Sequence, residues 1–465
     1  MIDIPPLNRR EFLRRAGTMT LSASGIAGCA SIHRATSYTA SIVEPENDSV
    51  VFYWTDVMLQ AVRDLSLSPI QATRGFAMAH LAGSTASGNQ TELLQRADPP
   101  EHIDQHIAFT VAFSMALEEA WSVSFALERH ASLRRREDAR NRDESVQWGR
   151  RIASLVNSYR TRDGAEPSRA NYYPVDSTTQ QAIIADNPMG WRPTGPFYGA
   201  PSGPGFRTFE RGELPAWGRQ RPWIVSNLQQ YEAEPFPHHR SSEFAEQFAK
   251  VKTLGRARGS ARSREQDQIA LFWEDGPSGI SNPGHFQLLA IDAVQRRSWS
   301  MADQARFFAA LSLAQADAAI IAWRTKYQHN ILRPETAIRF ADKRFGDVLG
   351  KSTEPGWQSY IPTPAFPSYV SGHSVFGAVS AKIMALMLGS DRIRLQSSVP
   401  DQVNWPQQLK GVSRSWSSFT ALAEENGASR EYGGVHWQAD NQQGLTLGYA
   451  LASEVFEKLQ PQFDL

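Results

Sequence analysis

Residues 303–332 read DQARFFAALSLAQADAAIIAWRTKYQHNIL, and the spacing of their apolar side chains predicts one long α-helix. The same spacing recurs on both sides of this stretch, whereas the strict alternation typical of β-strands is scarce. It is found in residues 51–63, 70–81, 103–131, 146–159, 242–252, 373–388 and 435–459. We therefore expect an all-α fold of two packed halves, each resembling a four-helix bundle.

Residues 162–237 interrupt this pattern, because proline, glycine and aromatic residues replace the periodic apolar ones. A stretch of this length without periodicity is more often a functional wrap or lid than a linker. We expect it to wrap a single helical domain, residues 49–465, whose functional residues lie within 320–445.

The composition restricts the classes of function. Lys plus Arg and Asp plus Glu both number 48 in 465 residues, so no overall charge would attract nucleic acid. The chain has no Gly-x-Gly-x-x-Gly after a predicted strand and no His-Glu-x-x-His, which removes the main support for a nucleotide or zinc-protease site. Function must come from a local cluster.

The first 29 residues resemble a twin-arginine export signal. Arg9-Arg10 precede a short apolar run, and Ile26-Ala27-Gly28-Cys29 is similar to a bacterial lipobox, whose cysteine is acylated. No later segment has the roughly 18 consecutive apolar residues that span a bilayer. We expect a linker at 30–48 and an exported bacterial lipoprotein, periplasmic or at the cell surface, held to the membrane by the Cys29 lipid alone. The alternative is an incidental thiol behind a basic leader.

The first of three short motifs lies at the end of the long helix. Lys326 and Arg333 are seven residues apart, nearly two helical turns, which predicts that both side chains leave one face of the helix. Pro334 disfavours helical geometry at Arg333 and is expected to end the helix there. Alone, the pair would also suit the solvent face of an amphipathic helix.

The second motif, Ser371-Gly372-His373, precedes an apolar run and is therefore expected at a helix start. Unpaired backbone N–H groups and the positive end of the helix dipole favour an anion there. Gly372 has no side chain to block its N–H, Ser371 adds a hydroxyl, and His373 is placed for proton transfer. An ordinary Ser N-cap with a nearby histidine is the alternative.

The third motif runs from Ser429-Arg430 to His436. These two charged residues are six apart, so an unbroken helix would point them to different faces, and Gly433-Gly434 can supply the break that turns both inward. Asp440 has the spacing to orient the imidazole of His436. Together the motifs supply three cations, hydrogen-bond donors and two imidazoles, which is what a trivalent oxyanion such as vanadate or phosphate needs.

In this order and spacing, the motifs resemble those of the vanadium haloperoxidase and acid phosphatase superfamily, also called the type 2 phosphatidic acid phosphatase group. Trp323 and Phe366 stand where members that oxidise chloride have an aromatic pair beside the vanadate. The region around 191–194 and 217–223 looks like that of bacterial vanadium-dependent haloperoxidases. Val370 departs from the pattern, because the family commonly has proline there.

The resemblance implies a role for each matched residue. His436 would bond vanadium through a ring nitrogen, while the vanadate oxygens would be held by Lys326, Arg333, Arg430, Ser371 and the amide of Gly372. His373 would accept a proton from hydrogen peroxide, and Lys326 would polarise the peroxide for attack by halide. Trp323 and Phe366 would line the halide pocket. Asp275, in Trp273-Glu274-Asp275, is the candidate partner of Arg430.

The implied function is a vanadate-dependent haloperoxidase that acts on bromide or iodide, with chloride, the organic acceptor and homo-oligomerisation left open. The alternative is an acid phosphatase, in which His436 takes the phosphoryl group and His373 protonates the leaving alcohol. A third reading is a binding lipoprotein without catalysis. His238-His239, His285 and His329 have no partner at ligand spacing and are expected to be surface or structural residues.

Overall fold

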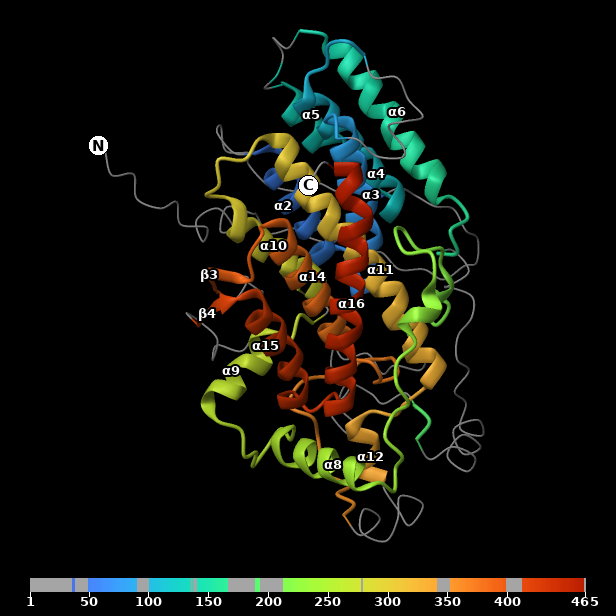
Figure 1. Ribbon diagram of the computed structural model, residues 1–465, viewed down its shortest axis with the longest axis vertical. Coiled ribbons are helices and arrows are strands. Elements are labelled where there is room, and N and C mark those ends of the chain that lie inside the picture. Colours follow the sequence, from blue (N-terminus) through green and yellow to red (C-terminus); the bar gives the residue numbers. More distant parts are fainter. Residues whose placement is uncertain are drawn as a thin grey trace, which may run out of the picture. The chain divides into compact units, whose positions relative to one another are not determined.

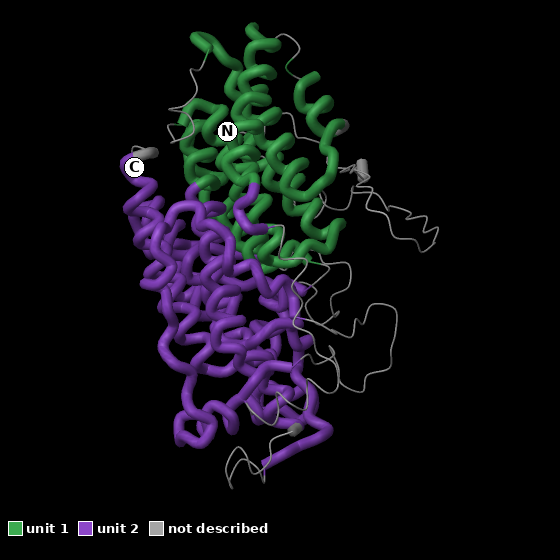
Figure 2. The backbone as a smooth tube through the Cα atoms, turned by 90° about the vertical axis from the view of Figure 1, so that its right-hand side faces the viewer, with its two compact units in different colours: residues 1–161, 277–309, 399–405 green, residues 162–276, 310–398, 406–465 purple. Residues whose placement is uncertain are grey.

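The chain folds into helices, with two short two-stranded sheets, in the computed structural model (Figure 1). The residues described are 36–37, 49–89, 100–134, 136, 140–165, 189–192, 212–276, 279–340, 352–398 and 412–463. The chain divides into two compact units (Figure 2). Unit 1 comprises residues 1–161, 277–309 and 399–405, and unit 2 comprises residues 162–276, 310–398 and 406–465. The prediction of an all-α fold is confirmed.

Unit 1 is a helical bundle in which α4 packs against α3 and α6. Its helices are α2 (Val50–Asp64), α3 (Pro69–Ala86), α4 (Gln105–Trp121), α5 (Ala126–Arg134), α6 (Arg142–Arg160) and α10 (Asn282–Val294). Strand β1 (Thr36–Ser37) pairs in parallel with β2 (Val123–Ser124). The sequence starts several of these helices with a serine cap, as at Ser68, whose side chain accepts from the amide of Gln71.

One predicted helix of unit 1, residues 103–131, is wrong in its extent. The structure ends α4 at Trp121 because Ser122 adopts a left-handed conformation with φ 55°. The amide of Phe125 then donates to the Glu118 carboxylate at 2.7 Å, and α5 begins one residue later. A local turn and a two-residue strand pair therefore override the apolar periodicity.

Unit 2 contains most of the remaining elements. Its helices are α8 (Ser242–Leu254), α9 (Arg264–Phe272), α12 (Pro334–Phe340), α14 (Gly372–Met387), α15 (Phe419–Tyr432) and α16 (Gln438–Phe463), with the 3-10 turns η3 (Trp217–Arg219) and η4 (Leu228–Tyr231). Strands β3 (Arg392–Ser398) and β4 (Ser413–Ser418) form an antiparallel pair. Helix α11 (Met301–His329) starts in unit 1 and continues in unit 2 from residue 310.

The packing of α14 against α16 and α15 places the second motif beside the third. Two glycines of α16 make the approach close. A Cβ on Gly444 would lie 2.7 Å from the Cβ of Ser374, and one on Gly448 would lie 2.6 Å from the carbonyl oxygen of Val375. Real Cβ atoms do not approach so closely, so larger residues would push the two helices apart.

The long helix predicted at 303–332 is present, but α11 ends at His329. Asn330 follows with φ 53°, a left-handed residue that turns the chain out of the helix. Arg333 therefore lies in the link before α12 and does not share a helical face with Lys326. The helical-face argument for this pair is wrong, although both side chains reach the same site.

Helix α11 is the one helix in the described part of the chain that is long and apolar enough to cross a membrane. Its most apolar window is 94% buried inside the protein, as expected for a core helix. The signal at 1–29 with Cys29, and the linker at 30–48 apart from β1, lie outside the described residues. That residues 49–465 form a single domain remains a prediction.

The predicted wrap, residues 162–237, is described at 162–165, 189–192 and 212–237. Its last part is fixed to α11 by the buried carboxylate of Asp317. This carboxylate accepts three successive backbone N–H groups, from Trp223 at 2.6 Å, Ile224 at 2.9 Å and Val225 at 3.1 Å. Irregular backbone can be buried there because a side chain of the helix satisfies its donors.

Candidate active site

All residues that the three motifs nominated lie in unit 2, and hydrogen bonds connect them into one cluster. Lys326 is in the last turn of α11, Arg333 is in the link before α12, and Ser371 to His373 begin α14. Arg430 is in the last turn of α15, and His436 lies in the turn before α16. We call Lys326, Arg333, Ser371, Gly372, Arg430 and His436 the cage residues.

Lys326 is fully buried and is held by the backbone that leads into α14. Its Nζ donates to the carbonyl oxygens of Pro367 and Ser368, both at 3.0 Å, and of Val370 at 2.5 Å. Burial lowers the pKa of Lys326 well below its usual range, and the neighbouring Arg333 adds to this effect. Val370, the departure from the family pattern, thus supplies a carbonyl that holds the lysine.

Arg333 connects the first motif to the third. Its Nε donates to the carbonyl of Phe366 at 2.9 Å and its Nη1 to that of Val435 at 2.7 Å, and Nη1 also lies 2.9 Å from Nε2 of His436. Because arginine has only donors, Nε2 of His436 must be the acceptor. Burial lowers the pKa of Arg333 to about 9, which leaves the guanidinium charged at neutral pH.

The tautomer of His436 follows from its two contacts. Nε2 accepts from Arg333, so the proton is on Nδ1, which lies 2.7 Å from Oδ2 of Asp440 and donates to it. Burial, followed by the charges of Arg333 and Lys326, lowers the pKa of His436 well below its usual range. The imidazole is therefore neutral, with a lone pair on Nε2, the form in which histidine binds a metal.

The fully buried Asp440 lies two residues inside α16 and accepts from His436 and from the amide of Trp437 at 3.0 Å. Burial raises the pKa of Asp440 to about 7, although the Trp437 amide and the charge of Lys326 act in the opposite direction. Gly434 makes this turn possible. It has φ 78°, and a Cβ there would lie 2.1 Å from the carbonyl oxygen of Gly255.

Arg430 and His373 share one acceptor, the carbonyl oxygen of Trp273. Nη1 of Arg430 donates to it at 3.0 Å, and Nε2 of His373 lies 2.9 Å from it. A carbonyl can only accept, so neutral His373 carries its proton on Nε2 and keeps a basic lone pair on Nδ1. Oδ2 of Asp275 is 3.9 Å from Nε2 of His373. Asp275 therefore lies beside both groups.

The charge balance around Arg430 includes one acid that the sequence did not nominate. Burial lowers the pKa of Arg430 to about 10, while Glu274 and Asp275 raise it. Burial in turn raises the pKa of Glu274 to about 7. Nε of Arg430 is buried and has no hydrogen-bond partner among the described residues. A donor of this kind is costly unless an acceptor reaches it.

Ser371 and Gly372 form the start of α14. The Ser371 hydroxyl accepts from the amide of Ser374 at 3.3 Å, and the Ser371 amide donates to the carbonyl of Asp440 at 2.9 Å. A Cβ on Gly372 would meet Phe376 and Trp323 at 3.9 Å and Lys326 at 4.0 Å, which are ordinary contacts. The start of α14 therefore lies beside Lys326 and the aromatic ring of Trp323.

The aromatic pair lies directly beside the cage residues. The rings of Trp323 and Phe366 have centroids 4.8 Å apart and planes inclined by 52°. Nζ of Lys326 is 5.0 Å from the Phe366 ring centroid and 5.9 Å from that of Trp323. The indole N–H of Trp323 donates to the carbonyl of Glu213 at 3.1 Å. The pair thus presents aromatic rings to Lys326, and the carbonyl of Glu213 holds the Trp323 indole in place.

These residues fit an oxyanion. Three buried cations, Lys326, Arg333 and Arg430, all have their pKa lowered by burial, so an anion placed among them would restore their charge balance. The unpartnered Nε of Arg430 and the first backbone N–H groups of α14 supply donors, and Nε2 of His436 supplies a lone pair. This donor set suits vanadate or phosphate, since both are tetrahedral oxyanions.

Sequence reasoning missed the groups that position the cage residues. They are mainly backbone carbonyls, of Trp273, Pro367, Ser368 and Glu213, which have no sequence signature. Among the other histidines, His238 accepts from the amide of Arg240, and the ring of His329 packs on Tyr369. In the part of the chain that the structure describes, no three His, Cys, Asp or Glu side chains gather around a metal position.

Comparisons with known proteins agree with this geometry. Residues 306–464 match the family model of the VCPO second helical-bundle domain. The vanadium chloroperoxidase of Curvularia inaequalis is 23% identical over 346 residues, which cover 62% of this chain and 54% of that protein. The chain therefore spans about half the length of this curated relative.

Two solved structures share the fold. The first bacterial vanadium-dependent iodoperoxidase superposes with a TM-score of 0.71 at 25% identity, over 90% of this chain and 98% of that one. An apo-type bacterial vanadium-dependent chloroperoxidase gives a TM-score of 0.66 at 17% identity, over 87% and 95% of the two chains. The chain is thus similar to vanadium haloperoxidases in fold, and in sequence over its second helical bundle.

Proposed function

We propose that this chain is a vanadate-dependent haloperoxidase, which uses hydrogen peroxide to oxidise halide to a hypohalous-acid equivalent that reacts with an organic acceptor. The observation that carries the proposal is the aromatic pair Trp323 and Phe366 beside Lys326. The cage residues alone would serve a phosphatase equally well. The relatives named as chloroperoxidase and iodoperoxidase support the same choice.

His436, Lys326, Arg333, Arg430, Ser371 and the Gly372 amide would hold the vanadate. When bound, vanadate supplies a Lewis-acidic centre that activates peroxide for transfer of one oxygen atom to halide. The protein supplies the ligand nitrogen Nε2 of His436, which Asp440 orients through Nδ1. It also supplies three fixed cations, and the Arg333 guanidinium, which lies 2.9 Å from Nε2, would neutralise an oxyanion bound there.

His373 moves the proton that the reaction requires. Its Nε2 is committed to the carbonyl of Trp273, so Nδ1 accepts a proton from hydrogen peroxide and later returns it to the oxygen that leaves as water. Lys326 would polarise the peroxide through the positive charge of its ammonium group, because its three N–H groups already donate to the carbonyls of Pro367, Ser368 and Val370. These carbonyls fix the ammonium group, which limits the reorganisation needed during the reaction.

Halide would approach along the side of Lys326 where Trp323 and Phe366 lie. An apolar wall beside a cation removes part of the hydration shell of a large, weakly hydrated anion, which favours iodide and bromide over fluoride or hydroxide. Trp323 is almost fully buried, so the wall is rigid on the helix side. The cost of dehydration makes chloride the most demanding of the three common substrates.

The test uses the full chain, freed of metal and then incubated with orthovanadate. Peroxide-dependent bromination and iodination of a dye are measured beside hydrolysis of an aryl phosphate. We expect halogenation that depends on vanadate, with little hydrolysis. Hydrolysis without halogenation would assign the same cage to a phosphatase, whose nucleophile would be His436.

Variants of the cage sharpen this test. His436→Ala should abolish retention of vanadate on gel filtration, whereas replacing the exposed His238 with alanine should retain it. Arg430→Gln removes charge-assisted hydrogen bonds worth roughly 1.5–3 kcal/mol, so vanadate affinity should fall by one to two powers of ten. Equal retention by the His436 and His238 variants would overturn the assigned ligand.

We further propose that the protein is exported by the twin-arginine route and anchored by a lipid on Cys29. The support is the order of paired arginines, apolar run and lipobox-like Ile26 to Cys29 in the sequence. Metabolic labelling with a fatty acid should mark the natural chain but not Cys29→Ser. Equal labelling of both, or of neither, would reject the anchor.

A further inference from the structure

A run of arginines between α8 and α9 is unrelated to the cage residues. Arg256, Arg258, Arg262 and Arg264 lie within nine residues, in the loop after α8 and the first turn of α9. Arg256 is paired with Glu354, and Arg262 lies 2.7 Å from Asp267. Arg258 and Arg264 are exposed, and neither makes an ion pair with any residue that the structure describes.

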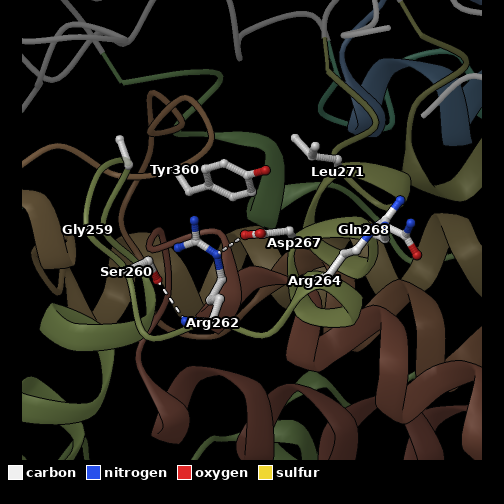
Figure 3. A pocket seen from close by; sticks show the side chains of 9 residues that line it. Gly259, Ser260, Arg262, Arg264, Asp267, Gln268, Leu271 and Tyr360 are labelled. Atoms are coloured by element: carbon white, nitrogen blue, oxygen red, sulfur yellow. Dashed lines mark hydrogen bonds and ion pairs between the residues drawn. The ribbon is translucent and has the colours of Figure 1, made fainter. Parts of the chain in front are cut away.

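This loop borders a cavity of about 580 Å³ in unit 2 (Figure 3). The loop itself, one side of α9 from Arg264 to Leu271, and Tyr360 from the segment before α14 line the cavity. A volume of roughly 300–1,000 Å³ is the usual size for a small organic ligand, whereas a single inorganic anion needs far less. The cavity is therefore large enough for an aromatic acid.

Arg262 fixes the floor of this cavity. Its side chain is 2% exposed, and its Nη1 donates to the carbonyls of Leu254, of Arg256 at 2.9 Å and of Tyr432 at 3.2 Å. Its guanidinium carbon lies 3.8 Å from the centroid of the Tyr360 ring, and Figure 3 shows the two groups stacked. Arg262 thus holds one face of the tyrosine and has little freedom to serve as a mobile anion ligand.

The groups left for a ligand are the side chains of Arg264, Gln268 and Leu271 and the Tyr360 hydroxyl. The one acid that lines the cavity, Asp267, is already paired with Arg262, so Arg264 leaves the lining with a net positive charge. The Tyr360 hydroxyl has no hydrogen-bond partner in the described part of the chain and points away from Arg262 in Figure 3. Burial raises the pKa of Tyr360, so this hydroxyl remains a donor at neutral pH.

We propose that the cavity between the 256–264 loop, α9 and Tyr360 binds an aromatic carboxylate. The carboxylate accepts from Arg264 and from the Tyr360 hydroxyl, while the ring packs on Leu271 and the edge of Tyr360. A neutral ligand would leave Arg264 without an anion, and a small inorganic anion would not cover Leu271 and the Tyr360 ring. The proposal does not depend on the haloperoxidase activity.

The site is tested by calorimetric titration of the full chain with benzoate, benzyl alcohol and inorganic phosphate. We expect benzoate to bind more tightly than either of the other two. Arg264→Gln and Tyr360→Phe should each weaken benzoate about three- to tenfold. Arg240→Gln is the matched control, because Arg240 precedes α8, whose 13 residues span roughly 20 Å.

Two further results distinguish this cavity from the cage residues. Excess orthovanadate should leave benzoate binding unchanged, and displacement by orthovanadate would place benzoate in the cage and overturn the proposal. It is also overturned if benzoate does not bind, if phosphate or benzyl alcohol binds as tightly, or if the Arg264 and Tyr360 variants behave like the Arg240 control.

Discussion

At the scale of single residues, the protein uses burial to fix the protonation state of its histidines. Both ring nitrogens of His436 have partners, Arg333 and Asp440, so the imidazole is held neutral in one tautomer. His80 in unit 1 is also buried, but neither of its nitrogens has a partner among the described residues. The first arrangement leaves the imidazole in the form that can bind a metal, whereas the second lowers stability at low pH.

The cost at His80 can be measured. The ring stacks on Phe308 at 5.4 Å and meets Phe113 edge-on at 4.9 Å, and burial lowers the pKa of His80 to about 3. The unfolded chain binds a proton below about pH 6.5, which the folded chain does not, so stability falls as the pH drops from 6.5 toward 3. At pH 5 the loss from this residue is about 2 kcal/mol.

His80→Phe should therefore remove part of the acid sensitivity. We expect the difference in unfolding free energy between pH 8 and pH 5, from urea titration followed by circular dichroism, to shrink by about 2 kcal/mol. Any cost of fitting the larger ring is present at both pH values and cancels in this difference. His130→Phe is the control, because His130 is exposed. The same pH dependence in the His80 variant and the natural chain would contradict the assignment.

At the scale of elements, the backbone of one residue, Glu213, holds the aromatic pair in place. The carbonyl of Glu213 accepts from the indole of Trp323 at 3.1 Å and from the hydroxyl of Tyr327 at 2.8 Å. The amide of Glu213 donates to the carbonyl of Ala365 at 2.8 Å, one residue before Phe366. The Pro-rich segment thus connects α11 to the loop that carries the second ring.

Tyr327→Phe should remove one of the two hydrogen bonds to the Glu213 carbonyl. The carbonyl keeps a donor, because the indole of Trp323 still donates to it. We expect a loss of about 1 kcal/mol in unfolding free energy, a several-fold rise in the KM for bromide and little change in kcat. Tyr449→Phe is the matched control, since its hydroxyl has no hydrogen-bond partner among the described residues. A fall in kcat at constant KM would show that Tyr327 acts on the reaction and not on halide placement.

The elements also show how far the sequence could predict this structure. Apolar periodicity located most helices, and Gly433-Gly434 correctly marked the break that brings Arg430 and His436 together. Apolar periodicity could not reveal that α11 ends at His329. The helix ends there because Asn330 adopts a left-handed backbone conformation, which the spacing of apolar residues does not report. Nor could this spacing show that the Trp273 carbonyl joins His373 to Arg430, since that contact spans about a hundred residues or more and involves no side chain of Trp273.

At the scale of the whole molecule, the charge is balanced overall but not locally. The 48 basic and 48 acidic residues cancel, yet three buried cations meet in unit 2. Every cage residue belongs to that unit, and so do His373, Trp323 and Phe366. Oxyanion binding should therefore stabilise one compact unit directly, by compensating cations that are otherwise buried at a cost.

Hydrogen exchange followed by mass spectrometry can resolve this effect along the chain. With orthovanadate at about one hundred times its dissociation constant, binding adds about 2.7 kcal/mol of stability. We expect slower exchange at 326–333, 371–374 and 430–440, and unchanged exchange in α4 and α6 of unit 1. Sulfate, a divalent oxyanion without affinity for imidazole nitrogen, is the control and should protect these segments much less. Equal protection in both units would mean that the anion stabilises the chain through its surface charges, and no protection at 430–440 would remove His436 from the site.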